Sequence, residues 1–265
     1  MGRDSCRFWE KITDNFYSIS MKIVLSPKYS ALDSFVSGIP DSFEKEGTVI
    51  YNQRNILKVF TVGEITFVVK RFRTPIFLNR IAYTYFRSSK ARRSFEHASL
   101  LQEKGIGTPD PIAYIEEKKN GLLYHSYYIC IYENESSHIR EQMLGKKGDQ
   151  TFIKELACFI AKMHNNGVFF LDLSPGNILF HLEEDQLKFS LVDINRMKFR
   201  TTIPLNTRFE NFKRISEDSG IIHNLAQEYA KACSLNEEET IKGITKSCID
   251  FYNKNHRTNY SQSAL

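Results

Sequence analysis

The sequence is poor in the features that mark secreted, zinc-binding and membrane-spanning proteins. Its 265 residues include only five cysteines, and no two of them form a C-x-x-C pair. An odd set without such pairs argues against a disulfide framework and against a structural zinc site. No apolar run approaches the roughly 18 residues that a membrane-spanning helix needs. These absences predict a soluble protein of the reducing cytoplasm.

The first residues also lack the apolar core of a signal peptide, because charged side chains interrupt them. A better-patterned segment opens at Met21. We therefore expect residues 1–20 to form an N-terminal tail and residues 21–265 to form one domain. With 42% hydrophobic and 25% charged residues, that domain has the composition of an ordinary globular protein.

Acidic side chains are missing from residues 70–93, which hold eight basic ones. The rest of the chain holds 28 basic and 31 acidic side chains, so this segment carries the whole positive excess of +5. If residues 80–90 are helical, Arg80, Arg87 and Lys90 fall within roughly an 80° sector. Such a sector is either a solvated helix face or a landing surface for an anionic membrane. We expect no nucleic-acid partner.

Strand patterns fill the first half of the chain and helical patterns the second. Residues 55–62 and 65–70 read as a β-hairpin around a Gly-Glu turn, with Lys70 at its end. Helices are predicted over residues 76–90, 91–104 and 152–163, and for most of 208–253. Strands followed by helices predict an α+β, bilobed fold. The lobes are expected over residues 21–135 and 136–265.

Three oxygen-bearing side chains near the middle of the chain suggest phosphoryl-transfer chemistry. Asp172 precedes a Ser-Pro-Gly turn, Asn177 follows that turn, and Asp193 ends a short apolar strand. The rigid turn lets the first two side chains point into one cleft. Mg²⁺ binds one or two carboxylates together with phosphate oxygens and waters. This set could therefore hold Mg²⁺ and orient an acceptor hydroxyl.

These residues resemble the catalytic core of the protein-kinase-like superfamily. The resemblance implies that Asp172 is the catalytic residue, that Asn177 and Asp193 bind the metal, and that Lys70 binds ATP phosphates. A glutamate on the following helix should pair with the lysine; Glu96 is the first candidate and Glu103 the alternative. The resemblance spans roughly residues 44–195 and implies an antiparallel β N-lobe with one or two helices and a mainly helical, truncated C-lobe.

The same resemblance assigns the remaining ATP contacts. Gly47 stands where the superfamily has its glycine-rich loop, and the backbone from Ile131 to Glu133 is expected to contact adenine. Several motif positions depart from the pattern. Phe170 and Leu171 replace the His and Arg of HRD, and Ser174 replaces the lysine two residues after the catalytic Asp. Regulation by phosphorylation of an activation loop is therefore not expected.

Within that superfamily the sequence resembles the lipopolysaccharide kinase family. The similarity rests on the run from Lys90 to Glu96, the Gly-Ile-Gly-Thr-Pro-Asp-Pro segment at 105–111, the Asp172-Leu-Ser-Pro-Gly-Asn loop and the short chain. It implies transfer of the ATP γ-phosphate, with Mg²⁺, to a heptose or 3-deoxy-D-manno-octulosonic acid (Kdo) hydroxyl of a lipid A-core glycolipid. It also implies a peripheral location at the cytoplasmic face of the inner membrane.

Two other functions remain open on the residues alone. One is a small atypical Ser/Thr protein kinase. The other is a pseudokinase that binds nucleotide and acts as a membrane-associated scaffold, which Phe170 and Leu171 favour slightly. Retention of the carboxylates, the amide and the lysine together argues against the scaffold. His164, eight residues before Asp172, is expected to be structural.

Overall fold

A computed structural model describes residues 7–11, 18–144 and 149–262. The chain forms two compact units. Unit 1 is drawn from residues 1–100 and 109–134, and unit 2 from residues 101–108 and 135–265. In the described residues, no helix combines the length and the apolar character needed to cross a membrane.

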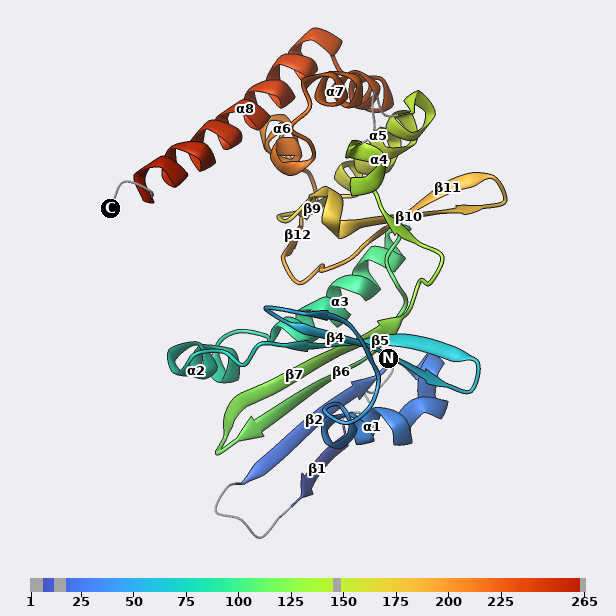
Figure 1. The fold of residues 1–265 in the computed structure, drawn as a ribbon, viewed down its shortest axis with the longest axis vertical. Helices are drawn as coiled ribbons and strands as arrows, with labels where there is room; N and C mark the ends of the chain where they lie inside the picture. The colour runs from blue at the N-terminus through green and yellow to red at the C-terminus, as the bar shows by residue number, and fades with distance from the viewer. Residues whose placement is uncertain (1–6, 12–17, 145–148, 263–265) are drawn as a thin grey trace. The chain divides into compact units, whose positions relative to one another are not determined.

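Unit 1 is built on a seven-stranded antiparallel sheet in the order β1-β2-β6-β7-β5-β4-β3 (Figure 1). The strands are β1 (Arg7–Lys11), β2 (Ile19–Leu25), β3 (Thr48–Asn52), β4 (Ile56–Val62), β5 (Ile65–Phe72), β6 (Pro111–Lys119) and β7 (Leu122–Ile131). The predicted hairpin is confirmed, because β4 and β5 pair from Val62 and Ile65 outward. Within residues 1–20, the predicted tail, β1 pairs with β2 at the sheet edge. Residues 1–6 and 12–17 of that segment lie outside the described residues.

The two faces of this sheet carry different helices. On one face, the short helix η1 (Pro27–Leu32) and α1 (Asp33–Ser42) contribute Val36 and Ile39 to a core shared with Phe67 and Val69 of β5. On the other face, Phe95 of α3 (Lys90–Glu103) packs on Tyr114 of β6, with 5.6 Å between ring centroids. Because side chains alternate along a strand, residues between the core positions of β5 face α3.

The predicted helix over residues 76–90 is wrong at its C-terminal end. α2 spans Phe77–Tyr85, and a new helix, α3, begins at Lys90. The break has a local cause: the buried Ser89 hydroxyl accepts a hydrogen bond from the Arg92 N–H at 3.0 Å, as an N-cap does. Arg80, Arg87 and Lys90 therefore do not share one helical face. Arg80 is also partly buried, and its Nε donates to the Leu123 carbonyl at 2.8 Å.

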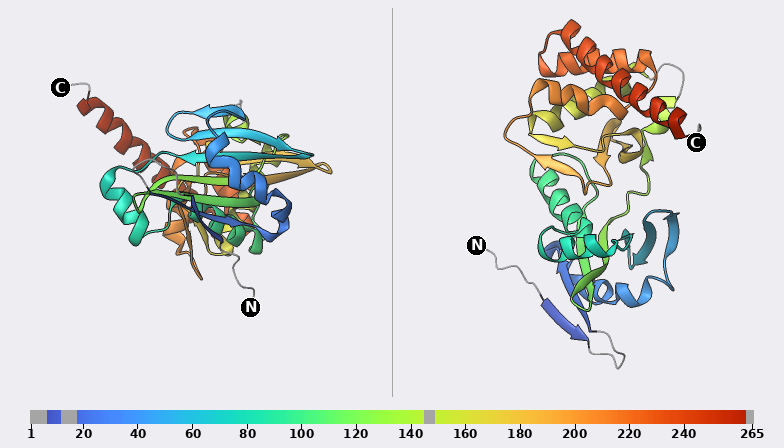
Figure 2. Two further views of the ribbon diagram at one scale, coloured as in Figure 1. Left: turned by 90° about the horizontal axis from the view of Figure 1, so that it is seen from below. Right: turned by 90° about the vertical axis from the view of Figure 1, so that its left-hand side faces the viewer.

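Unit 2 is mainly helical, with short strands near its middle (Figures 1 and 2). Its helices are α4 (Arg140–Leu144), α5 (Gln150–Asn165), α6 (Leu205–Asn211), α7 (Ser219–Cys233) and α8 (Glu237–Gln262), with one-turn helices η2 (Pro175–Asn177) and η3 (Phe212–Arg214). Its strands are β8 (Ser137–His138), β9 (Val168–Phe170), β10 (Ile178–Glu183), β11 (Gln186–Leu191) and β12 (Met197–Phe199). They form a β11-β10-β8 sheet and a β12-β9 pair.

Helical packing follows the apolar periodicity of α5 and α7. α5 begins at an N-cap, where the Asp149 side chain accepts from the Thr151 N–H at 2.9 Å. Its Ile153, Leu156 and Ile160 are buried. α7 packs against α5 and α8, and Figure 2 shows α7 and α8 side by side. Of these helices, α5 also contacts the strands β9 and β11 of unit 2.

Candidate active site

A short loop in unit 2 carries two of the predicted functional residues. Asp172 lies just after β9, and Asn177 is the last residue of η2. The Asn177 side-chain amide donates to the Asp172 carbonyl at 2.9 Å, and its backbone N–H donates to the Ser174 carbonyl at 2.9 Å. The Ser-Pro-Gly turn thus closes on itself and brings the two residues together, as the sequence predicts.

Asp193 joins this loop from the next strand. β10 and β11 pair with Ile178 opposite Leu191, and the Val192 N–H donates to the Asn177 carbonyl at 3.0 Å. Asp193 follows directly with a left-handed backbone, φ +54°. Its carboxylate accepts from the Asn195 amide at 2.6 Å. The sheet register therefore sets Asn177 opposite Val192, one residue before Asp193.

The side-chain oxygens of Asn177 and Asp193 are of the kind that binds a magnesium ion. The Asn177 side chain uses its nitrogen for the Asp172 carbonyl, so its oxygen Oδ1 is oriented away from that bond. An amide oxygen and the nearby Asp193 carboxylate are the hard oxygen ligands that Mg²⁺ accepts alongside phosphate oxygens and waters. Within the described ranges, no cluster of three or more His, Cys, Asp or Glu side chains is arranged to hold a metal ion.

Two arginines that no sequence motif marks bind the Asp172 carboxylate. Nη1 of Arg196 and Nη1 of Arg214 each lie 3.2 Å from Asp172 Oδ1. Asp172 is largely buried, at 21% side-chain exposure, whereas the arginines are 59% and 43% exposed. Arg214 also lies over the Phe251 ring, 5.2 Å from its centroid. Both arginines converge on one oxygen, so the carboxylate is held from that side.

A buried chain of uncharged hydrogen bonds supports the loop from behind. The Asn211 amide donates to the carbonyl of Phe170, two residues before Asp172, at 2.7 Å. Its side-chain oxygen accepts from His164 Nε2 at 3.0 Å, so His164 Nδ1 accepts from the Tyr229 hydroxyl at 2.8 Å. Burial lowers the pKa of His164 to about 4. The neutral ring is thus a structural element, as the sequence predicts.

Lys70 lies in unit 1, near the end of β5. It pairs across the strands with Tyr128, which in turn pairs with Tyr114, the residue against α3. Cross-strand partners share a face, so Lys70 lies on the face that α3 covers. Its Nζ is 5.3 Å from the Phe72 ring centroid. This placement brings Lys70 to the same side of the sheet as the part of α3 that carries Glu96.

The first candidate partner of Lys70, Glu96, forms an ion pair within its own helix. Glu96 accepts from Arg92 Nε on its own helix at 2.7 Å, an i,i+4 ion pair. Both Arg92 and Glu96 are more than 40% exposed, so this pair contributes little to stability. The pairing of Lys70 with Glu96 or with Glu103 stays a prediction.

Gly47 follows a backbone segment that the buried Lys58 binds. Gly47 has φ +79°, and a Cβ there would lie 2.6 Å from the Phe60 ring. Lys58 of β4 is buried and donates to the carbonyls of Phe43, at 2.5 Å, and Glu46, at 2.9 Å. Packing and backbone geometry thus explain the glycine, and a contact with ATP stays a prediction.

The predicted adenine-contacting backbone follows β7. The Ile131 N–H donates to the Asp110 carbonyl at 2.9 Å, and the Tyr132 N–H donates to the Thr66 carbonyl at 3.0 Å. Burial raises the pKa of the neighbouring Cys130 thiol to about 12, which makes it unreactive. The roles of Ile131 and Glu133 toward a nucleotide stay predictions.

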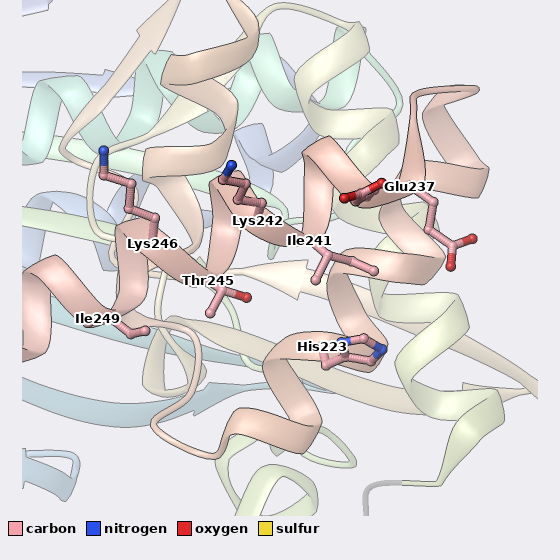
Figure 3. Close-up of a pocket in the computed structure, with 8 residues that line it drawn as sticks. His223, Glu237, Ile241, Lys242, Thr245, Lys246 and Ile249 are labelled. Carbon is pink, nitrogen blue, oxygen red and sulfur yellow. The ribbon is translucent and has the colours of Figure 1, made fainter.

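A groove of about 740 Å³ lies between α7 and α8 (Figure 3). His223 lines it from α7, and Ile241, Thr245 and Ile249 line it from α8. None of the predicted catalytic, ATP-binding or metal-binding residues belongs to its lining. The groove is therefore a separate feature of unit 2.

Comparison with known proteins supports the sequence resemblance. The model of the lipopolysaccharide kinase (Kdo/WaaP) family matches residues 55–231. Among solved structures, one described as "WaaP in complex with acyl carrier protein" is similar with a TM-score of 0.60 and 15% sequence identity. That match covers 89% of this chain and 98% of the other, and it confirms the kinase-like α+β fold. No curated protein matches this chain significantly.

Proposed function

The chain belongs to the lipopolysaccharide kinase (Kdo/WaaP) family of phosphotransferases, and we propose that it transfers the γ-phosphate of ATP to a heptose or Kdo hydroxyl of the lipopolysaccharide inner core. The observation that carries this proposal is the loop from Asp172 to Asn177, which the hydrogen bond from the Asn177 amide to the Asp172 carbonyl closes, with Asp193 directly after Val192, whose N–H donates to the Asn177 carbonyl. Those side chains supply what phosphoryl transfer requires: a group that orients the acceptor hydroxyl and oxygen ligands beside it.

Asp172 is proposed to receive the acceptor hydroxyl. Its Oδ1 is held by Arg196 and Arg214, and the loop behind it is fixed through Asn211 to His164. A carboxylate fixed in this way accepts the hydroxyl proton as the new oxygen–phosphorus bond forms. Because positioning supplies much of the rate in phosphoryl transfer, the arginines act by holding the carboxylate in place.

ATP is proposed to bind through unit 1. Lys70 contacts the phosphates, with Glu96 as the first candidate to fix it and Glu103 as the alternative. Gly47 lets the backbone approach the phosphates, and Ile131 to Glu133 contact adenine. The placement of Lys70 on the α3 face of the sheet supports this assignment. Asn177 and Asp193 would hold Mg²⁺, which neutralises charge on the phosphates when it is bound.

The acceptor is proposed to be a membrane-embedded glycolipid, which places the protein at the inner face of the inner membrane as a peripheral protein. Exposed basic side chains in residues 70–93 support this location, because each contributes about 1 kcal/mol near an anionic surface. Arg87 is exposed and free to face a membrane. Arg80 instead donates a hydrogen bond to the Leu123 carbonyl of unit 1, and Lys90 lies on a different helix, α3.

Radiolabelled phosphate transfer tests the function directly. The full chain is incubated with Mg·ATP and lipopolysaccharide extracted from cells that lack the gene, in parallel with a protein acceptor. We expect label on the glycolipid and not on protein. Asp172→Asn should lower transfer by roughly 10² to 10⁴-fold while nucleotide binding survives, because only the proton acceptor is lost.

Asp185→Asn is the matched control, since it makes the same change at the β10–β11 turn, where the left-handed backbone, φ +59°, accepts asparagine. Full transfer by Asp172→Asn would overturn the catalytic assignment. Label on protein alone would favour the protein kinase, and nucleotide binding without turnover would favour the scaffold.

A further inference from the structure

Helix α2 directs polar side chains toward the sheet and leaves large apolar side chains exposed to solvent. It contacts β7 through polar groups: Arg80 Nε donates to the Leu123 carbonyl at 2.8 Å, and the Leu123 N–H donates to the Thr84 hydroxyl at 3.0 Å. Figure 1 shows α2 beside β7. None of the nine residues of α2, all of which are described, is buried. Its apolar side chains Phe77, Leu78 and Tyr85 are exposed and therefore lie outside the core of unit 1.

Five apolar side chains of the helix and its ends are exposed to solvent. The exposed fractions are 69% for Ile76, 63% for Phe77, 74% for Leu78, 68% for Tyr85 and 85% for Phe86. On the helix, Phe77, Leu78 and Tyr85 fall within roughly a 100° sector. Single exposed apolar residues are common, but a group of five within eleven positions marks a contact site. We call these five residues the α2 surface.

The residues around the α2 surface are positively charged, which favours an anionic partner. Arg73 precedes the helix and Arg87 follows it, and both are exposed. No acidic side chain occurs anywhere from residue 70 to residue 93. An apolar face that is flanked by arginine and free of carboxylates is the chemistry of a helix that lies in the interface of an anionic bilayer.

We propose that the α2 surface inserts into the headgroup region of an anionic membrane, with Arg73 and Arg87 against lipid phosphates. This inference rests on the proposed function in one respect, namely that a glycolipid acceptor resides in such a membrane. It differs from the sequence prediction in its means of attachment. The membrane contact comes from apolar side chains of α2, and Arg80 faces the sheet.

Vesicle flotation of the full chain tests the proposal. One set of vesicles contains phosphatidylglycerol and phosphatidylethanolamine, and the other contains phosphatidylcholine alone. We expect the chain to float with the anionic vesicles. Leu78→Gln and Phe86→Gln should each lower the partition coefficient by about tenfold, because each removes one inserted apolar side chain. Replacing Arg73 and Arg87 together by glutamate should weaken binding to the anionic vesicles.

The matched control is Leu182→Gln, because Leu182 is similarly exposed, at 66%, on the β10 strand of unit 2. This variant should bind vesicles as the original chain does. Absence of binding to anionic vesicles, or equal loss in Leu182→Gln, would overturn the proposal. A dimer in sedimentation velocity that Leu78→Gln dissociates, with no vesicle binding, would assign the α2 surface to a second copy of the chain.

Phosphate transfer to detergent-dispersed glycolipid separates this inference from the proposed function. Variants of the α2 surface should retain that transfer while they lose vesicle binding. Vesicle binding without any transfer by the original chain would refute the kinase assignment and leave the membrane surface standing. Phosphate transfer without vesicle binding would overturn the membrane proposal and leave the kinase assignment standing.

Discussion

Arg214 and Asp172 are joined by an ion pair of 3.2 Å although 42 residues separate them in the sequence. Arg214 comes from η3, and its guanidinium also rests on Phe251 of α8. The pair therefore ties the candidate catalytic loop to the C-terminal helices. Arg196 makes the matching contact from the segment after Asp193.

Replacement of Arg214 should reduce the rate of transfer more than the affinity for ATP. In Arg214→Gln we expect kcat to fall roughly 10- to 100-fold, with the KM for ATP nearly unchanged, because the carboxylate loses one of its two fixing groups. Lys213→Gln is the control, since Lys213 lies over the same Phe251 ring without contacting Asp172. Steady-state kinetics with full activity in Arg214→Gln would contradict the positioning role.

Substitutions of the two lysines in the β4–β5 hairpin should have different effects: one on activity and the other on stability. Lys70→Met should raise the KM for ATP or abolish turnover while the melting temperature stays unchanged, because Lys70 is assigned to phosphates. Lys58→Met should lower the free energy of unfolding by about 1–3 kcal/mol, because it leaves the buried Phe43 carbonyl and the part-buried Glu46 carbonyl without their donor. Nucleotide-binding and urea-unfolding measurements compare the two. A stable Lys58→Met protein would remove the structural role.

Gly107 should not tolerate a side chain. A Cβ at this position would lie 2.0 Å from the Phe189 carbonyl oxygen, and the Leu191 N–H donates to the Gly107 carbonyl at 2.9 Å. Gly107→Ala should therefore cost about 3 kcal/mol of stability through displaced backbone. In the control Gly38→Ala, nothing lies within 4 Å of the new Cβ inside α1, so a gain of about 0.5–1 kcal/mol is expected. Equal effects in thermal unfolding would contradict this account.

Acidification should destabilise the fold through His164. Burial lowers its pKa from 6.5 to about 4, so between those values the unfolded chain binds the proton and the folded chain does not. Stability therefore falls as the pH drops below 6.5, by about 2 kcal/mol from pH 7 to pH 5 for this one group. Burial and the nearby Arg71 also lower the pKa of His125 to about 4, so it adds a loss of the same sign.

Unfolding in urea at both pH values measures this loss. His164→Gln should reduce the difference between pH 7 and pH 5, because the titrating group is gone. His223→Gln is a control, since His223 lies at the groove between α7 and α8 and outside the buried chain of hydrogen bonds. An unchanged pH difference in His164→Gln would contradict the assignment.

The arrangement of the three candidate site residues could be predicted from the sequence because it is local. A tight turn fixes Asn177 relative to Asp172, and the β10–β11 register sets Val192, the residue before Asp193, opposite Asn177. The hairpin that delivers Lys70 was predictable for the same reason: two alternating apolar runs flank a turn. Local rules of turns and strands thus account for the part of the site that was found.

The arginines at Asp172 could not be predicted, because their contacts depend on tertiary packing. No spacing rule connects residue 214 with residue 172. Lys58 was missed because a lysine in an alternating strand is normally exposed, and only the fold shows that it binds carbonyls. The end of α2 was misplaced because Ser89 gives a capping signal that a continuous basic and apolar pattern obscured.

The support behind the candidate catalytic loop runs through Tyr229, His164 and Asn211 and contains no ion pair. The Asp172 carboxylate itself is held by two exposed arginines, Arg196 and Arg214. Added salt screens exposed charges and leaves buried neutral hydrogen bonds nearly unaffected. High ionic strength should therefore loosen the carboxylate while the backbone beneath it stays in place, giving an enzyme that slows in concentrated salt long before it unfolds.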